Sequence, residues 1–159
     1  MAGSGVRADL IGEITLARLG LEDMDGAARV HRAAFDERLP WLSGRHTSRE
    51  DRDFFRTHVF NLCEVWGASG PEGLAGIVAF RDGWVDQLYV LPRTQGRGVG
   101  TKLLWVAKAA FPRLSLWTFQ RNTGARRFYE GRGFVATEQT DGTGNEEKEP
   151  DVLYRWARG

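Results

Sequence analysis

Cysteine is almost absent from this chain: Cys63 is the single example in 159 residues. One cysteine cannot close an internal disulfide, and it cannot supply the cysteine clusters that hold structural zinc or iron–sulfur centres. The residue stands in the strand-like stretch NLCEVWGA, where we expect it to be buried in the core. We therefore expect no metal site, and the composition suits a reducing compartment.

A strong net charge and a long apolar run are also missing. The chain has 22 Lys and Arg against 21 Asp and Glu, a net charge of +1, which argues against the basic footprint of a dedicated nucleic-acid binder. No apolar run reaches the roughly 18 residues that a membrane helix needs, and the opening MAGSGVRADLIG lacks the basic and apolar segments of a secretion signal. We expect a cytoplasmic protein without a nucleic-acid or membrane partner.

The residues that are present suit one globular domain, because 42% of them are hydrophobic and the chain shows neither internal repeats nor a linker. Residues 1–12 are small and rich in glycine, so we expect them to form a flexible tail. Residues 13–159 are expected to form the domain, with Trp66, Trp105 and Trp117 in its core.

Apolar periodicity and turn residues predict the order β-α-α-β-β-β-α-β-α-β-β, which is an α+β domain around a mixed sheet. Ser48 precedes a charged amphipathic run and is the expected N-cap of the second helix. Pro112 is expected to end the third helix. The expected strands are 13–19, 62–68, 74–83, 84–91, 114–119, 134–140 and 151–157. The expected helices are 22–37, 49–60, 98–111 and one that begins at 122 and ends at Gly131 or Gly133.

Three alternating glycines, Gly96, Gly98 and Gly100, join a predicted strand to a predicted helix. Glycine loses more backbone entropy on ordering than other residues, so such a run needs a backbone reason or a ligand reason. The amides of residues 97–101 are unpaired first-turn donors, and the helix dipole favours an anion in front of them. The stretch suits a diphosphate, although a turn that needs positive φ would also explain the glycines.

Two other phosphate-binding motifs can be tested directly on this stretch. The pattern G-x-x-x-x-G-K-[ST] fails because Gly100 is followed by Thr101 and only then by Lys102. The dinucleotide pattern G-x-G-x-x-G fails because the glycines are evenly spaced. ATP and NAD are therefore disfavoured as ligands.

The stretch QGRGVG, with Gln95, Gly98 and Gly100, matches the Q-x-x-G-x-G/A signature of the GCN5-related N-acetyltransferase (GNAT) family. DQLYVLP before it resembles the family's strand that pairs with pantetheine, and LWTFQRNTGARRFYEGRGF after it resembles the family's next strand and helix. The agreement extends over residues 76–134. The resemblance, to a small bacterial-type member, implies a mixed, mostly antiparallel twisted sheet, flanked by helices and splayed between its fourth and fifth strands.

The resemblance also implies acetyl-CoA as co-substrate, without a metal. The family's glycine loop holds the pyrophosphate of coenzyme A on backbone amides. The splayed strands would leave backbone groups of Leu88 and Val90 free to pair with pantetheine, and Asn122 would hydrogen-bond the pantetheine or the loop behind it. The implied cofactor residues are Leu88, Tyr89, Val90, Gln95, Gly96, Arg97, Gly98, Val99, Gly100, Thr101, Asn122, Ala125 and Phe128.

Tyr129 is the expected catalytic acid. It shares a helix face with Asn122 and Ala125, and the resemblance implies that its hydroxyl lies near the thioester sulfur. An amine that attacks a thioester expels a thiolate, which a nearby phenol can hydrogen-bond or protonate. The alternative is that Tyr129 is a core aromatic residue like its neighbour Phe128.

Asp86 is the expected catalytic base, because an ammonium group must lose a proton before it can attack. It is the only acid in its predicted strand, and VDQLYVLPRTQGRGVGTKLL resembles aminoglycoside N-acetyltransferases in which the Asp before Gln belongs to the active site. Asp86 could equally be a hydrogen-bonded strand end. Glu64 on a neighbouring strand, or an ordered water, is the alternative base.

The resemblance implies that the acceptor enters between the first two helices and the closing strands. We expect the acids there to face the acceptor while Arg93, Arg97 and Arg121 stay near the cofactor, which favours a small cationic amine. The alternative is a solvated acidic loop. The implied acceptor residues are Phe35, Trp41, His46 and Trp84, with Leu39, Glu146, Glu147, Glu149 and Asp151 around them.

The expected function is therefore acetyl transfer from acetyl-CoA to a primary amine, by direct attack in a ternary complex. A protein or peptide amine is an alternative acceptor. A non-catalytic acyl-CoA sensor of the same fold is an alternative function, and a nucleotide-binding module is a distant one. The sequence is compatible with a monomer or a homodimer.

Overall fold

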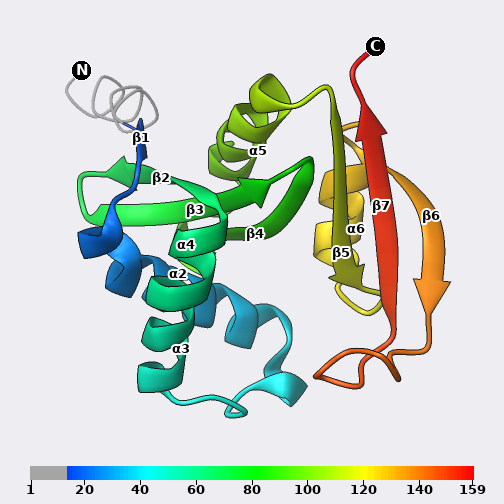
Figure 1. Ribbon diagram of the computed structural model, residues 1–159, viewed down its shortest axis with the longest axis horizontal. Coiled ribbons are helices and arrows are strands. Elements are labelled where there is room, and N and C mark those ends of the chain that lie inside the picture. Colours follow the sequence, from blue (N-terminus) through cyan, green and yellow to red (C-terminus); the bar gives the residue numbers. More distant parts are fainter. Residues whose placement is uncertain (1–13) are drawn as a thin grey trace, which may run out of the picture.

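The computed structural model describes residues 14–159, so the predicted tail at 1–12 lies outside the described residues. Its centre is a seven-stranded sheet with the order β1-β2-β3-β4-β5-β7-β6 (Figure 1). The pairings are antiparallel except for the one between β4 and β5. The strands are β1 (Thr15–Arg18), β2 (Glu64–Gly70), β3 (Gly73–Arg81), β4 (Trp84–Val90), β5 (Arg113–Phe119), β6 (Val135–Thr140) and β7 (Asp151–Ala157).

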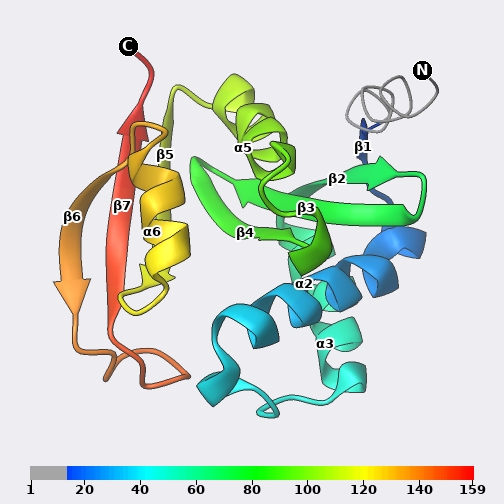
Figure 2. The same cartoon turned by 180° about the vertical axis from the view of Figure 1, so that it is seen from behind.

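Helices cover both faces of this sheet. α2 and the α3–α4 region pack on one face, while α5 and α6 pack on the other (Figures 1 and 2). The predicted element order and the α+β class are confirmed. The helices are α2 (Met24–Arg38), α3 (Ser48–Phe54), α4 (Phe60–Leu62), α5 (Val99–Ala110) and α6 (Thr123–Glu130), and the π-helical segment Phe55–Val59 joins α3 to α4.

A two-residue turn joins β3 to β4 and positions the start of β4 in the sheet. Asp82 and Gly83 have φ values of 48° and 81°, the paired positive values that suit a two-residue hairpin, and Asp-Gly is a preferred sequence for it. The carbonyl of Gly83 then accepts a hydrogen bond from the amide of Ser115, 2.8 Å away. The tight turn thus brings the start of β4 against β5.

After this contact the two strands separate. Trp84 and Ser115 form the single residue pair between β4 and β5. Figure 1 shows β4 and β5 running apart from there, with the half of the sheet that holds β5, β6 and β7 turned away from the half that holds β1 to β4. The predicted splay between the fourth and fifth strands is confirmed, and it leaves one edge of β4 without a partner strand.

A β-bulge in β4 lies at the beginning of that free edge. Ala79 pairs with Gln87 and Phe80 pairs with Val85, so Asp86 has no partner in β3. Bulges bend a strand and redirect side chains, and they are common beside active sites. The bulge sets Asp86 apart from the regular alternation of β4.

Two apolar clusters, one on each face of the sheet, hold the fold together. The first joins α5 and α6 to the sheet and includes Leu103, Leu116 and Tyr154. The second joins α2 and the π-helical segment to β3 through Met24 and Phe55. Each fully buried aliphatic or aromatic side chain contributes about 1.5–3 kcal/mol. The two faces of β4 therefore belong to different clusters, which fixes where its side chains point.

Several sequence-based expectations were wrong in detail. Trp105 and Trp117 are not in the core, since 73% and 43% of their surfaces are exposed. The N-cap before α3 is Thr47 and not Ser48, because Thr47 forms a capping box with Glu50. Cys63 is half-buried and precedes β2.

No helix among residues 14–159 is both long and apolar enough to cross a membrane.

Candidate active site

The glycine loop has the backbone geometry of an anion-binding turn. Gly96 and Gly98 have φ values of 77° and 81°, a left-handed conformation that other residues adopt only with strain. A Cβ at either position would meet no atom within 4 Å, so the space in front of the loop is open. Gly98 is the N-cap of α5, and the first-turn amides after it lack intrahelical partners. The loop thus has both the positive-φ turn and the open space for a ligand that the sequence analysis gave as alternative reasons for the glycines.

The free edge of β4 runs past this loop. The amide of Leu91 donates to the carbonyl of Ala75 in β3, 2.8 Å away. Because antiparallel residues alternate between facing and turning away from the neighbouring strand, the backbone groups of Leu88 and Val90 point into the gap beside β5. One of these groups is occupied: the side-chain amide of Gln95 donates to the carbonyl of Val90 at 2.9 Å.

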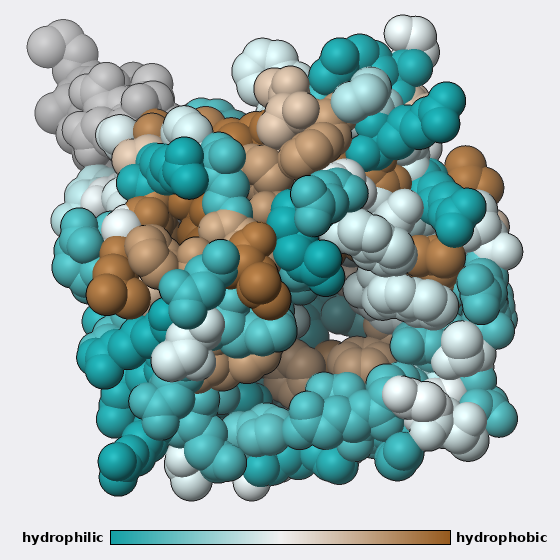
Figure 3. Space-filling model, viewed as in Figure 1, coloured by the Kyte–Doolittle hydropathy of each residue, from teal (hydrophilic) through white to brown (hydrophobic). Residues whose placement is uncertain are grey.

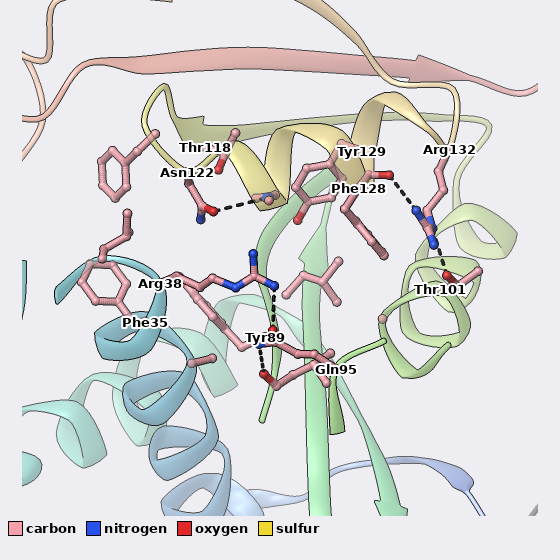
Figure 4. A pocket seen from close by; sticks show the side chains of 18 of the residues that line it. Phe35, Arg38, Tyr89, Gln95, Thr101, Thr118, Asn122, Phe128, Tyr129 and Arg132 are labelled. Atoms are coloured by element: carbon pink, nitrogen blue, oxygen red, sulfur yellow. Dashed lines mark hydrogen bonds between the residues drawn. The ribbon is translucent and has the colours of Figure 1, made fainter. Parts of the chain in front are cut away.

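A cavity of about 380 Å³ lies between β4, β5, the glycine loop and α6, and we call it the loop cavity. Every residue predicted for the cofactor lines it except Arg97 and Val99; Val99 is buried in the core. Figure 4 shows this cavity from close by, with Asn122, Phe128 and Tyr129 above it and Gln95 below (Figure 4). The site side chains that line it are those of Leu88, Tyr89, Val90, Gln95, Thr101, Asn122, Ala125, Phe128, Tyr129 and Asp86.

The cations of the loop cavity are Arg38 and Arg132, which the sequence reasoning did not select. Arg132 donates to the hydroxyl of Thr101 at 2.9 Å and lies over the ring of Phe128. The structure does not bring the expected cations there: Arg93 lies 3.4 Å from Glu72, and Arg97 is not a lining residue. Nearness in sequence to the glycines did not predict which side chains turn toward the cavity.

Arg121 is also elsewhere. Its guanidinium binds both oxygens of Glu149 at 2.8 Å, and it lies 4.0 Å from the centre of the Trp41 ring. Trp41 donates to the same carboxylate at 3.1 Å. Because these hydrogen bonds satisfy the carboxylate, the pKa of Glu149 is lowered and its charge is neutralised locally. Glu149 and Trp41 therefore brace the loop before β7 and line neither cavity.

Tyr129 projects from α6 into the loop cavity. It is 8% exposed, and its ring contacts Phe128, Phe134 and Tyr154. Burial raises the pKa of its phenol far above the ordinary value, so the hydroxyl stays protonated at neutral pH. Figure 4 shows the hydroxyl directed into the cavity. Asn122 is the N-cap of this helix, since its Oδ1 accepts from the amide of Ala125 at 3.2 Å.

Asp86 lines the loop cavity from the bulge of β4. Its Oδ2 lies 2.7 Å from Nε of Arg81 and accepts from the thiol of Cys63 at 3.4 Å. Burial, and then the charge of Asp86, raise the pKa of Cys63 to about 12, so this thiol is neutral. Glu64 accepts from the indole of Trp66 at 2.7 Å on β2 and lines neither cavity.

A second cavity of about 880 Å³ opens between α2, α3, β5 and the loop before β7, and we call it the acidic cavity. Figure 3 shows a hollow between the α2 side and the β5 side of the molecule, rimmed by hydrophilic residues (Figure 3). Six carboxylates and two guanidinium groups line the cavity. The acids are Glu50, Asp51, Glu138, Glu146, Glu147 and Asp151, and the arginines are Arg32 and Arg45.

Some of the predicted acceptor residues line one or both of the two cavities, and others line neither. Phe35 lines both, and His46 lines the acidic cavity, where its Nε2 lies 2.7 Å from Glu146. Leu39 lines the loop cavity instead. Trp84 begins β4 beside Ser115 and lines neither cavity.

The two cavities meet. Phe35, Tyr89, Trp117, Thr118 and Phe119 line both of them, so these residues form the junction. The junction lies where β4 and β5 have separated, beside the free edge of β4. A ligand in the loop cavity and another in the acidic cavity could therefore touch there without passing through the protein.

A family comparison identifies this arrangement. The model of the acetyltransferase (GNAT) family matches residues 28–134, which is more than half of the chain. The chain belongs to the GNAT family. The matched range contains the glycine loop, the free edge of β4 and Tyr129, and the resemblance drawn from the sequence is confirmed.

Individual GNAT relatives support the fold. The chain is 32% identical over 84 residues to the peptidyl-lysine N-acetyltransferase YiaC of Escherichia coli, an alignment that covers 52% of this chain and 55% of that protein. The chain thus spans about half the length of the curated relative it matches. The apo form of YjaB from Escherichia coli has a TM-score of 0.76 at 21% identity, covering 92% of this chain and 99% of that one. PaiA N-acetyltransferase from Thermoplasma acidophilum, solved with coenzyme A, has a TM-score of 0.67 at 18% identity, covering 91% and 98%.

Two buried polar atoms lie where α2 packs on β4. His31 contacts Tyr89 edge to face, with ring centres 4.6 Å apart. Burial, and then the charge of Arg32, lower the pKa of His31 to about 4, so the ring is neutral at pH 7. Nδ1 of His31 and Oε1 of Gln87 are both shielded from solvent and have no hydrogen-bond partner among the described residues. Both side chains line the acidic cavity.

Proposed function

We propose that this protein is an acetyl-CoA-dependent N-acetyltransferase that acetylates a primary amine by direct attack in a ternary complex. The observation that carries the proposal is the junction of the two cavities at Tyr89 and Thr118. A thioester in the loop cavity and an amine in the acidic cavity would meet at this point. Holding two reactants together in this way removes much of the entropic barrier of a bimolecular reaction.

The residues of the loop cavity fit acetyl-CoA. The left-handed Gly96 and Gly98 leave open space before the first-turn amides of α5, which suits a pyrophosphate. The backbone groups of Leu88 and the amide of Val90 lie at a strand edge that a pantetheine arm can pair with. Arg38 supplies further positive charge in the same cavity. Family membership, and a structural neighbour solved with coenzyme A, support this assignment.

Tyr129 is proposed as the general acid. The attacking amine nitrogen forms a bond to the acetyl carbon, and the bond from that carbon to sulfur breaks, so the thiolate needs a proton. A phenol whose pKa is raised by burial carries that proton at neutral pH.

Asp86 is proposed as the base that takes a proton from the attacking ammonium, directly or through water. The bulge in β4 directs it to the loop cavity, and Arg81 with Cys63 holds its carboxylate in place. Ordered water remains the alternative base. Glu64 is disfavoured, because it lies on β2 and lines neither cavity.

The acceptor is proposed to be a small cationic molecule. Six carboxylates against two guanidinium groups make the acidic cavity attractive to a cation, which raises its local concentration and its rate of encounter. The lysine side chain of a peptide is the second candidate, favoured by the similarity to the peptidyl-lysine N-acetyltransferase YiaC.

The experiment is a survey of acceptors with purified protein and acetyl-CoA. Polyamines, aminoglycosides, amino acids and lysine peptides are offered one at a time, and free thiol release and the mass of the acetylated product are both measured. The proposal expects thiol and acetylated amine in equal amounts for at least one cationic amine. Thiol release without an acetylated product for every acceptor would contradict it.

A further inference from the structure

One carboxylate of the acidic cavity differs from the others. Glu147 is half-buried and, among residues 14–159, forms no side-chain hydrogen bond or ion pair. Asp51, by contrast, is held by both Nε and Nη2 of Arg32 at 2.8 Å. Glu146 is paired with His46. Asp51 and Glu146 are thus already paired, and Glu138, which forms no side-chain bond among residues 14–159 either, is exposed. Glu147 is the half-buried carboxylate whose charge is available to a ligand.

The charge of Glu147 reaches the junction. Burial, and then this carboxylate, raise the pKa of the Tyr89 phenol to about 12, so Glu147 acts on a side chain that lines both cavities. Glu147 itself lines the acidic cavity alone. A group bound by Glu147 would therefore share the acidic cavity with the junction residue Tyr89 without occupying the loop cavity.

A second residue of the acidic cavity has an unsatisfied acceptor atom. Gln87 lines the acidic cavity, and its Oε1, which is shielded from solvent in this structure, has no hydrogen-bond partner among residues 14–159; such an atom is costly unless a small turn of the side chain lets a ligand or water reach it. Gln87 and Tyr89 are two residues apart on β4, so they share the face that turns toward α2. An ammonium group carries three N–H donors and no acceptor, which suits a carboxylate, an amide oxygen and water around it.

We propose that Glu147 and Gln87 form a subsite for a second cationic group of the acceptor, so that the substrate class is an amine that carries another ammonium a few bonds from the reacting nitrogen. The inference rests on the proposed function, since it assumes that the reacting amine sits at the junction. The distal ammonium keeps its proton and binds at Glu147, while the reacting nitrogen loses its proton and attacks. A lysine within a peptide offers only the reacting ammonium and leaves this subsite to water.

The test compares cadaverine with pentylamine, which has the same carbon chain and one ammonium fewer. In the unmodified protein, kcat/KM for cadaverine should exceed that for pentylamine by about tenfold, which a partly desolvated charge pair supplies. Glu147→Gln should remove most of this preference. Glu146→Gln deletes the same charge from the next residue, and because Glu146 is already paired with His46, it should lower both values together and keep their ratio.

The outcomes separate the inference from the proposed function. Equal kcat/KM for the two amines, or a preference that survives in Glu147→Gln, would overturn the inference while leaving acetyl transfer intact. Failure to acetylate any amine, with acetyl-CoA bound, would contradict the proposed function itself. Acetyl-CoA should raise the melting temperature of both variants as it does for the unmodified protein, which shows that each is folded.

Discussion

Arg38 and Gln95 join two distant parts of the chain across the loop cavity, with Nη2 of Arg38 2.6 Å from Oε1 of Gln95. The amide of the same Gln95 donates to the carbonyl of Val90 at the free edge of β4. The other end of the guanidinium fills the space that a side chain at position 124 would need, in the first turn of α6. Figure 4 shows the arginine reaching over the cavity from α2.

A cation against the N-terminus of a helix is unfavourable unless an anion joins it. Arg38 should therefore bind the phosphates of acetyl-CoA, and Arg38→Gln should weaken acetyl-CoA binding about tenfold, as loss of a hydrogen bond to a charged group does. Calorimetry checks this, with S-acetylpantetheine, which lacks the pyrophosphate, as the comparison ligand. An equal loss for both ligands would show that Arg38 supports the cavity and not the phosphates.

Gly98→Glu should abolish the stabilisation by acetyl-CoA, because it places a side chain and a negative charge where the pyrophosphate approaches. Gly44→Glu is the matched control: Gly44 has φ 80°, also has open space around it, and lines neither cavity. Both variants should lose roughly 1–2 kcal/mol of stability from the strained backbone. Thermal unfolding with and without acetyl-CoA separates them, and a normal ligand-induced shift in Gly98→Glu would rule out the loop as the pyrophosphate site.

Tyr129→Phe keeps the ring contacts and removes only the hydroxyl. Turnover should fall by about 10², the contribution of general acid catalysis, while acetyl-CoA affinity and melting temperature stay unchanged. Because burial raises the pKa of this phenol, the unmodified protein should show no loss of the acid form of Tyr129 as pH rises to about 10. Steady-state rates of Tyr129→Phe and of the unmodified protein, measured across pH, test both expectations. If the two rates agree, Tyr129 is a packing residue like Phe134.

The fold was largely predictable because the chain carries strong local signals. Alternating apolar residues and the glycines Gly96 and Gly98 each act over a few residues, and each produced the expected element. Trp105 was misjudged for an identifiable reason. Its size suggested the core, but the buried face of α5 is formed by Val99, Leu103, Leu104 and Ala107, and position 105 lies off that face.

The candidate site was predictable only where backbone geometry defines it. The glycine loop and the free strand edge follow from local sequence, but Arg38 reaches the loop from a helix about 57 residues away. The pairing of Arg121 with Glu149 likewise joins a turn to a distant loop. Such contacts depend on how the elements pack, and a charge pattern read along the chain does not contain them.

His31 should make the protein sensitive to acid. Its pKa is lowered from about 6.5 in the unfolded chain to about 4, so as pH falls through this window the unfolded state binds the proton first and stability is lost. The free energy of unfolding falls by about 3 kcal/mol at most through this titration. The charged groups that also act on His31 are Arg32, Asp36, Asp51 and His46. Above pH 6.5 His31 is neutral in both the folded and the unfolded state, so its titration costs no stability there.

His31→Phe keeps an aromatic ring next to Tyr89 and Phe55 and removes the titration. Urea unfolding between pH 7 and 4 should therefore show a shallower loss of stability in this variant. His58→Phe, at an exposed position, is the control and should follow the unmodified protein. Parallel curves for His31→Phe and the unmodified protein would contradict the assignment.

The central claim is that acetyl passes directly from thioester to amine at the junction of the two cavities. The neutral thiol of Cys63, the only cysteine, is hydrogen-bonded to Asp86 and is not suited to carry an acetyl group. The initial rate, measured while acetyl-CoA and the amine are varied together, tests the claim most directly. Intersecting double-reciprocal lines are the predicted result, and parallel lines, with an acetyl group found on the protein by mass spectrometry, would contradict it.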